Sequence, residues 1–123
     1  MNANKQVLIG RILSVVVCLP LIMSAVMKVV GGQQVVEGMT HLGWPLTTLY
    51  GLAALELMSV VVYLIPRTSV LGAILFTGYM GGAMATHLRI GEPLFIQLGV
   101  GIVAWLGIYL REPRLREIMP LRK

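Results

Sequence analysis

The sequence predicts an all-α protein, an integral membrane bundle of four helices, on three observations. The chain of 123 residues is 57% hydrophobic and only 12% charged, whereas soluble domains carry about 25% charged residues. Its apolar residues fall into four blocks, each close to the length of about 20 residues that a helix needs to cross a bilayer. Helix-breaking and polar residues separate these blocks. We therefore expect a single membrane domain over residues 1–123.

The predicted elements follow in order: spans at residues 7–30, 46–65, 70–87 and 94–110, then a basic tail at 111–123. Basic residues precede the apolar run of the first span, as in a signal peptide, but no A-x-A cleavage site follows, which favours an uncleaved helix. GGQQ ends this span, and Pro45 opens the second. PRTS separates the second span from the third, and GEP separates the third from the fourth.

The basic residues indicate the orientation of the spans. Both termini and the 66–69 loop share one side, which holds eight of the ten Lys and Arg residues. Only Lys28 and Arg89 lie toward the other side. Because cytoplasmic loops are enriched in Lys and Arg, we expect cytoplasmic termini in a bacterial inner membrane. The tail then faces anionic lipid headgroups, and the apolar composition argues against nucleic-acid binding.

The loop after the first span is long and has helical periodicity. Val35, Val36, Met39 and Leu42 recur at the spacing of one helix face. This pattern predicts a short amphipathic helix on the outer surface, with Trp44 in the interfacial aromatic belt. Such a helix would cap a pocket beneath it.

Polar residues within the spans indicate where that pocket lies. The residues concerned are Ser24, Lys28, Glu56, His87 and Gln97. Ionisable groups in a membrane normally face the bundle interior or a cavity. Glu56 lies about 15 Å along the second span, near the midplane, and the others lie nearer the outer end. We therefore expect a polar pocket that opens away from the cytoplasm.

Structural explanations compete with this pocket. A structural bond to Lys28 or to a tyrosine accounts for Glu56, and a position at a helix end accounts for His87 and Arg89. An interhelical hydrogen bond accounts for Gln97. The sequence leaves both explanations open.

Small residues in the third span form two adjacent rows at i, i+4 spacing. One row contains Gly78, Gly82 and Thr86, and the other contains Ala73, Thr77, Gly81 and Ala85. Rows of this kind let a second helix approach closely. We expect Gly78, Gly81, Gly82 and Ala85 to pack against another helix, either within the bundle or between protomers of a homo-oligomer.

The sequence contains no strong catalytic motif. It has no Asp, no GxGxxG, no Walker loop and no HExxH, and its two histidines are too few for a convincing metal site, so we predict no metal. The single cysteine, Cys18, excludes a CxxC redox pair within the chain. These features identify no catalytic residue.

Three stretches carry a family resemblance by their order and spacing. They are MSAVMKVV, with Ser24 four residues before Lys28; LGWP followed by LYGLAALELMSVVVYLIPRT, with Glu56; and GYMGGAMATHLRIGEP. Together, from about Leu21 to Arg114, they resemble the DoxX-like family of small bacterial membrane proteins. This resemblance implies a four-helix membrane bundle. It also implies sulfur, thiol or oxidative-stress redox work with quinone or redox partner proteins, although a single cysteine argues against thiol chemistry by the chain alone.

Three functions remain open, and we prefer the first. It is a redox-associated subunit that binds a quinone-like or lipidic ligand, with Glu56 as proton acceptor or anchor, whether or not the subunit is itself an enzyme. The second is a small proton-coupled transporter that uses the intramembrane Glu56, although transporters of this size keep that residue in the first span. The third is a non-catalytic membrane scaffold.

Overall fold

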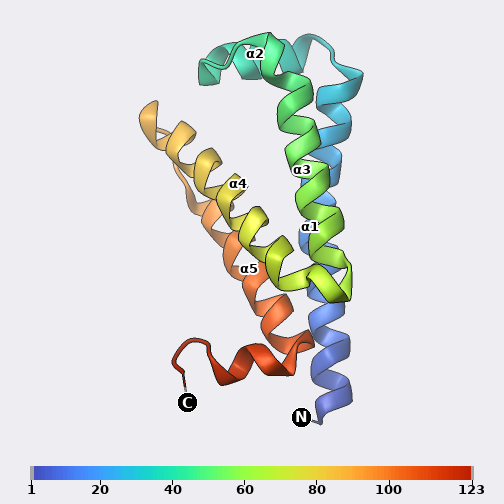
Figure 1. The fold of residues 1–123 in the computed structure, drawn as a ribbon. Helices are drawn as coiled ribbons and strands as arrows, with labels where there is room; N and C mark the ends of the chain where they lie inside the picture. Colours follow the sequence, from blue (N-terminus) through green and yellow to red (C-terminus); the bar gives the residue numbers. More distant parts are fainter. Residues whose placement is uncertain (1, 123) are drawn as a thin grey trace.

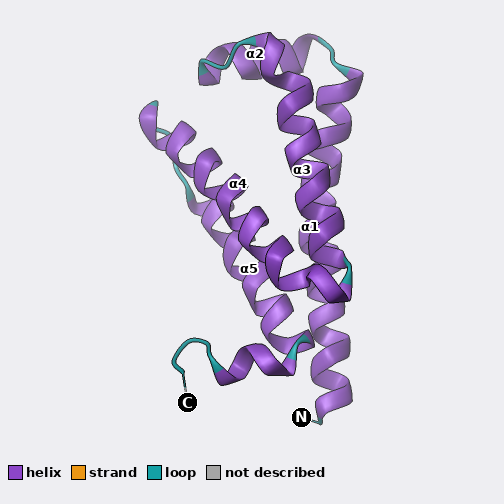
Figure 2. Ribbon diagram, viewed as in Figure 1, coloured by secondary structure: helices purple, strands orange, loops and turns teal. Residues whose placement is uncertain are grey.

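The computed structural model describes residues 2–122, and these residues are almost entirely helical and contain no strand (Figures 1 and 2). The α-helices are α1 (Ala3–Val30), α2 (Gln33–Leu42), α3 (Leu49–Leu64), α4 (Ser69–Arg89) and α5 (Phe95–Arg111). Three short 3-10 segments join or follow them: η1 (Leu46–Thr48), η2 (Pro66–Thr68) and η3 (Pro113–Glu117). The predicted all-α class is confirmed.

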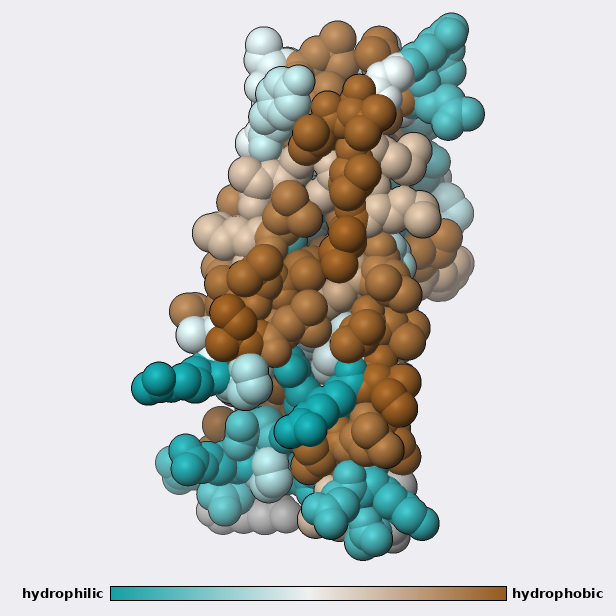
Figure 3. Space-filling model, turned by 90° about the vertical axis from the view of Figure 1, so that its right-hand side faces the viewer, coloured by the Kyte–Doolittle hydropathy of each residue, from teal (hydrophilic) through white to brown (hydrophobic). Residues whose placement is uncertain are grey.

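The long helices have the length and surface of membrane spans. Within the described residues, Ala3–Val30, Leu46–Leu64 and Pro66–Arg89 are long and apolar enough to cross a membrane, and α5 is apolar but has only 17 residues. Figure 3 shows a broad hydrophobic surface on one face, with hydrophilic residues gathered toward the ends. Large apolar side chains such as Leu19 and Ile74 are more than half exposed. Such a surface fits lipid tails and is incompatible with water, so the molecule is a membrane protein.

The four long helices run antiparallel in chain order and close into a ring. α1 packs against α3 and α5, and α4 packs against the same two helices from the other side. Figure 1 places both chain ends together, here called the terminal end, and α2 at the opposite end, here called the α2 end. The α4–α5 pair lies against α1 and α3 at the terminal end and diverges from them toward the α2 end.

Glycines produce the close contact at the terminal end. A Cβ added to Gly10 of α1 would lie 2.6 Å from the carbonyl oxygen of Gly107 in α5. Gly72 of α4 likewise lies directly against the backbone of Tyr63 in α3. Only a residue without a side chain permits such close backbone approach.

Tyr63 ties three helices together at this end. Its side chain is fully buried, and its hydroxyl donates to the carbonyl of Ala104 at 2.5 Å and lies 3.1 Å from the hydroxyl of Ser14. The guanidinium of Arg111 lies 4.6 Å from the centre of the Tyr63 ring and donates to the Tyr63 carbonyl. These contacts fix α1, α3 and α5 relative to one another.

The glycines in the small-residue rows of α4 make no close contact within the described chain. A Cβ built at Gly78, Gly81 or Gly82 meets nothing within 4 Å in the described part of the chain, and Ala85 is exposed. Of the two predicted alternatives, close packing of these glycines within the bundle is therefore not seen among residues 2–122. The i, i+4 spacing identifies residues on a common face, but it does not say which element covers that face. Packing against another protomer stays a prediction.

A helix forms in the first loop where the periodicity predicted one. α2 lies between Gly32 and Gly43, whose φ angles of 120° and 80° suit glycine. Met39 is buried on its inner face, and Val36 is exposed. That α2 lies on the outer membrane surface, and that the termini are cytoplasmic, stay predictions.

Candidate functional site

The divergence of the helices leaves a cavity of about 490 Å³ beneath α2. Residues from all five α-helices line it, together with Trp44. Most of the lining is apolar, including Leu21, Leu52, Leu55, Met80 and Val100. Its volume falls within the range of about 300–1,000 Å³ that is typical of small-molecule sites.

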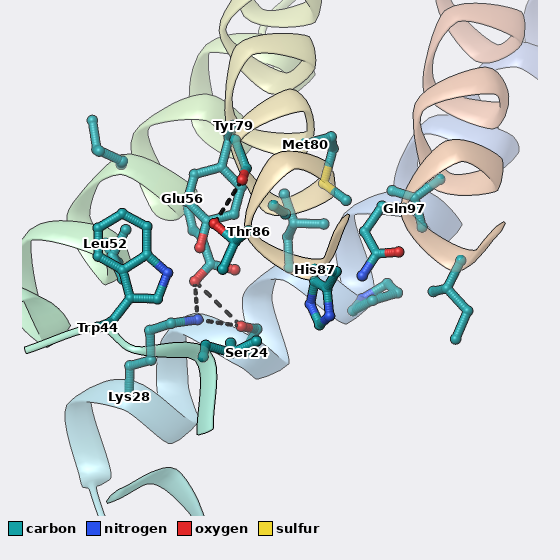
Figure 4. Close-up of a pocket in the computed structure, with 18 of the residues that line it drawn as sticks. Ser24, Lys28, Trp44, Leu52, Glu56, Tyr79, Met80, Thr86, His87 and Gln97 are labelled. Carbon is teal, nitrogen blue, oxygen red and sulfur yellow. Dashed lines mark hydrogen bonds and ion pairs between the residues drawn. The ribbon is translucent and has the colours of Figure 1, made fainter. Parts of the chain in front are cut away.

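An ion pair forms one wall of the cavity (Figure 4). Lys28 Nζ of α1 lies 2.5 Å from Glu56 Oε1 of α3 and 2.6 Å from Ser24 Oγ, and the Ser24 hydroxyl donates to the same Glu56 oxygen at 3.2 Å. Ser24 and Lys28 are one turn apart on α1, so they share the face that packs against α3. The side chain of Glu56 is only 2% exposed and that of Lys28 is 16% exposed. Pairing lets a carboxylate remain at this depth without an isolated buried charge.

His87 and Gln97 line the same cavity from α4 and α5. In Figure 4 they lie across from Lys28, on the opposite side of the hollow. His87 Nδ1 is 3.6 Å from Glu92 Oε1. Gln97 Oε1 is buried and has no hydrogen-bond partner among residues 2–122. A buried amide oxygen without a donor is uncommon, and the Gln97 side chain that carries it lines the cavity.

The structure thus brings all five sequence-predicted site residues to one cavity. Ser24, Lys28 and Glu56 form a connected cluster, whereas His87 and Gln97 stand apart from it. Whether these residues bind a ligand stays a prediction.

Sequence reasoning missed several residues of the lining. Tyr79 of α4 lies beside Glu56, and Thr86 projects nearby (Figure 4). The Thr86 hydroxyl already donates to the carbonyl of Gly82. Gly78 and Gly82 also line the cavity, and their lack of a side chain leaves room in its wall. A signal for Tyr79 existed, since a lone tyrosine hydroxyl near the middle of an apolar helix needs a polar partner.

α2 covers the cavity and is tied to the far pair of helices. Its residues Met39 and Leu42 form part of the lining. Arg89 at the end of α4 donates to the carbonyl of Leu42, and His41 Nε2 lies 3.1 Å from Glu92 Oε1. Arg89, placed by the sequence at a helix end, thus also holds the end of α2.

The chemistry of the lining suits a ligand with an apolar body and a polar head. Lys28 supplies a donor, Gln97 carries an unpaired acceptor, and the rest of the wall is largely hydrocarbon. Cys18 is buried in the core and does not line the cavity. Within residues 2–122, no group of three or more His, Cys, Asp or Glu side chains is placed to hold a metal ion.

Comparison with known protein families gives a match over most of the chain. The family model described as the DoxX-like family matches residues 12–109, which are 98 of the 123 residues. Comparisons with curated proteins and with solved structures gave no match.

Proposed function

This chain belongs to the DoxX-like family, and from that premise we propose that it binds a quinone-like ligand in the cavity beneath α2. One observation carries the proposal: an apolar cavity of about 490 Å³ has a buried ion pair on one wall and an unpaired amide oxygen on the other. A quinone matches this arrangement because its ring carries carbonyls on opposite edges and its remaining surface is apolar.

Each polar group has a role in this proposal. Lys28 donates its remaining N–H to one ring carbonyl, and Glu56 and Ser24 keep the ammonium of Lys28 oriented toward the cavity. Gln97 Oε1 accepts from the hydroxyl of the reduced, quinol form, while His87 contacts the same edge of the ring. Held in this way, a ring is oriented by a few polar contacts within an apolar site.

We assign the chain the part of an accessory subunit that holds the ligand for a redox partner protein. The single cysteine is buried and cannot form a disulfide within the chain. The electrons exchanged with the ligand therefore come from, or go to, that partner.

The ion pair argues against the proton-coupled transporter. In such a transporter, a membrane carboxylate binds either a proton or a cationic substrate. Here the ammonium of Lys28 already lies 2.5 Å from Glu56. A cationic substrate would have to displace a tethered cation of its own sign.

The proposed setting is the bacterial inner membrane, with both termini in the cytoplasm. The terminal end carries the exposed basic residues Lys5, Arg11, Arg67, Arg114 and Arg122. This distribution supports the orientation because positive residues are retained on the cytoplasmic side. The cavity then opens outward, and α2 lies at the outer surface.

The test is native mass spectrometry of the protein released gently from its membrane, with analysis of the lipid extract. We expect a bound quinone, and a lower occupancy in the Glu56→Gln and Gln97→Leu variants. Glu37→Gln is the matched control, because Glu37 is exposed on α2 and bonds only to Gln33 among the described residues.

Three other outcomes would overturn the proposal. If the lipid extract of the purified protein contains no more quinone than the membrane it came from, the protein binds no quinone and the proposal fails. Uptake of a cation into proteoliposomes that follows a pH gradient would favour transport. Unchanged partner capture and partner activity after joint substitution of Glu56, Lys28 and His87 would favour a scaffold.

A further inference from the structure

A second hollow adjoins the cavity. It is an apolar groove of about 620 Å³ along the membrane-facing side of α3, lined by Trp44, Thr48, Gly51, Leu52, Ala54, Leu55 and Met58. Trp44, Leu52 and Leu55 also line the cavity, so these three residues form a wall common to both spaces. The groove and the cavity are therefore neighbours.

The pattern of small and large residues on α3 creates this groove. Gly51 and Ala54 form its floor, and the half-exposed side chains of Leu55 and Met58 stand beside them. Nothing lies within 4 Å of a Cβ built at Gly51. From Gly51 to Met58 the helix advances about 10 Å, which carries the groove from the α2 end down to the depth of Glu56.

We propose that this groove holds the apolar tail of the ligand whose polar ring occupies the cavity, an inference that rests on the proposed function. The cavity of about 490 Å³ encloses a substituted ring but not a chain of several isoprene units. The tail must therefore leave the cavity. The groove shares a wall with the cavity, is almost wholly apolar, and runs toward the middle of the bilayer, where such tails lie.

It follows that Gly51 and Ala54 determine which tails are accepted. Side chains at these positions point into the groove and away from the rest of the fold, because both residues are exposed. A bulky residue here blocks the path of the tail but leaves the polar contacts of the ring untouched. The groove is then a specificity element, distinct from the ion pair that holds the ring.

The experiment compares two probes on the protein in nanodiscs. One is a radiolabelled quinone with a long isoprenoid tail, and the other has the same ring with a single isoprene unit. We expect Gly51→Leu and Ala54→Phe to weaken binding of the long-tailed quinone about tenfold, or about 1.4 kcal/mol. Binding of the short-tailed quinone should stay within about twofold, less than about 0.5 kcal/mol.

The control is Gly101→Leu on α5. A Cβ at Gly101 also meets nothing within 4 Å in the described chain, and this residue lines neither the cavity nor the groove. The same substitution there should change neither affinity. It also measures any general effect of adding a leucine to an open helix surface.

The outcomes separate this inference from the proposed function. If neither probe binds the wild-type protein, the proposed function fails, and the groove proposal falls with it. If both probes bind but filling the groove affects them equally or not at all, only the groove proposal is overturned. If Ile96→Trp weakens binding of the long-tailed quinone selectively and Gly51→Leu does not, the tail leaves the cavity on the α5 side and the groove proposal is overturned.

Discussion

Glu56 lies at a depth where a lone charge would be costly, and its surroundings show how that cost is offset. Lys28 supplies the opposite charge at 2.5 Å, and Ser24 donates a further hydrogen bond at 3.2 Å. Both partners come from one turn of α1, so a single helix contact assembles the whole cluster. The pair makes this wall polar but electrically neutral.

Removing one member of the pair should destabilise the fold. Glu56→Gln leaves the ammonium of Lys28 without its counter-ion, and we expect a loss of about 2 kcal/mol in the free energy of unfolding. This loss lies below the range for fully buried pairs because the side chain of Lys28 keeps 16% of its exposure. Reversible unfolding in mixed micelles measures it.

A double substitution tests whether the two charges are coupled. Adding Lys28→Met to Glu56→Gln removes the stranded ammonium, so part of the lost stability should return. If the losses in the two single variants instead simply add in the double variant, the ion pair contributes nothing to stability.

The charged residues of the site were predictable, but most of its uncharged lining was not. Lys28 and Glu56 stand out because each interrupts an apolar span, and their depths follow from counting residues. Sequence spacing could not establish that they touch, since this depends on the rotation of α1 and α3 about their axes. The hydroxyl of Tyr79 was the only signal that this residue offered, and Trp44, expected in the interfacial belt, offered none that placed it in a cavity wall.

Among the elements, α2 has the weakest attachment to the bundle. Two flanking glycines allow it to turn across the end of the molecule, and a buried Met39 points beneath it. Its polar ties reach the end of α4 through Arg89 and the following loop through Glu92. Loss of these ties should loosen α2 without unfolding the four long helices.

We therefore expect Arg89→Ala and Glu92→Gln to raise amide hydrogen exchange across residues 33–42. The rest of the chain should keep its exchange rates, because these contacts lie outside the helix ring. Glu37→Gln is the comparison, since Glu37 belongs to α2 but bonds only along the helix. Unchanged exchange in both variants would show that apolar contacts alone hold α2.

Glycines in α4 should differ sharply in their tolerance of a methyl group. Gly72→Ala forces a Cβ against the backbone of Tyr63, and we expect a loss of about 1–3 kcal/mol in unfolding free energy. Gly81→Ala meets open space and should be neutral or stabilise the helix by up to about 1 kcal/mol. Similar losses in both variants would contradict the positions of these residues.

For the whole molecule, the main feature is a difference between its two ends. At the terminal end, Gly10, Gly72 and Tyr63 bring helix backbones into contact. At the α2 end, the helices diverge and enclose the cavity. The number of helices and their alternating direction followed from composition and breakers. The divergence of the helices could not be predicted in this way, because it depends on which glycines contact a neighbouring helix. Gly78, Gly81 and Gly82 of α4 contact none within the described chain.

The orientation of the molecule is tested by cysteine labelling. On a Cys18→Ala background, Glu37→Cys should react with a membrane-impermeant maleimide added to intact spheroplasts. Glu117→Cys should react only after the membrane is permeabilised, because basic residues keep that end inside. Both native residues are exposed. The reverse pattern would overturn the orientation, and labelling of both would rule out an even number of spans.

Trp44 lies in the wall of the cavity, in the wall of the groove, and in a smaller hollow beside Ala85 and Arg89. The chain has only one other tryptophan, Trp105, whose indole donates to the hydroxyl of Thr77 on the far pair of helices. A Trp105→Phe protein therefore carries a single tryptophan, which can be excited selectively over the four tyrosines, at the junction of all three spaces. Its emission can be read without any added label, and quinone rings are efficient quenchers. The protein thus contains its own optical reporter of occupancy.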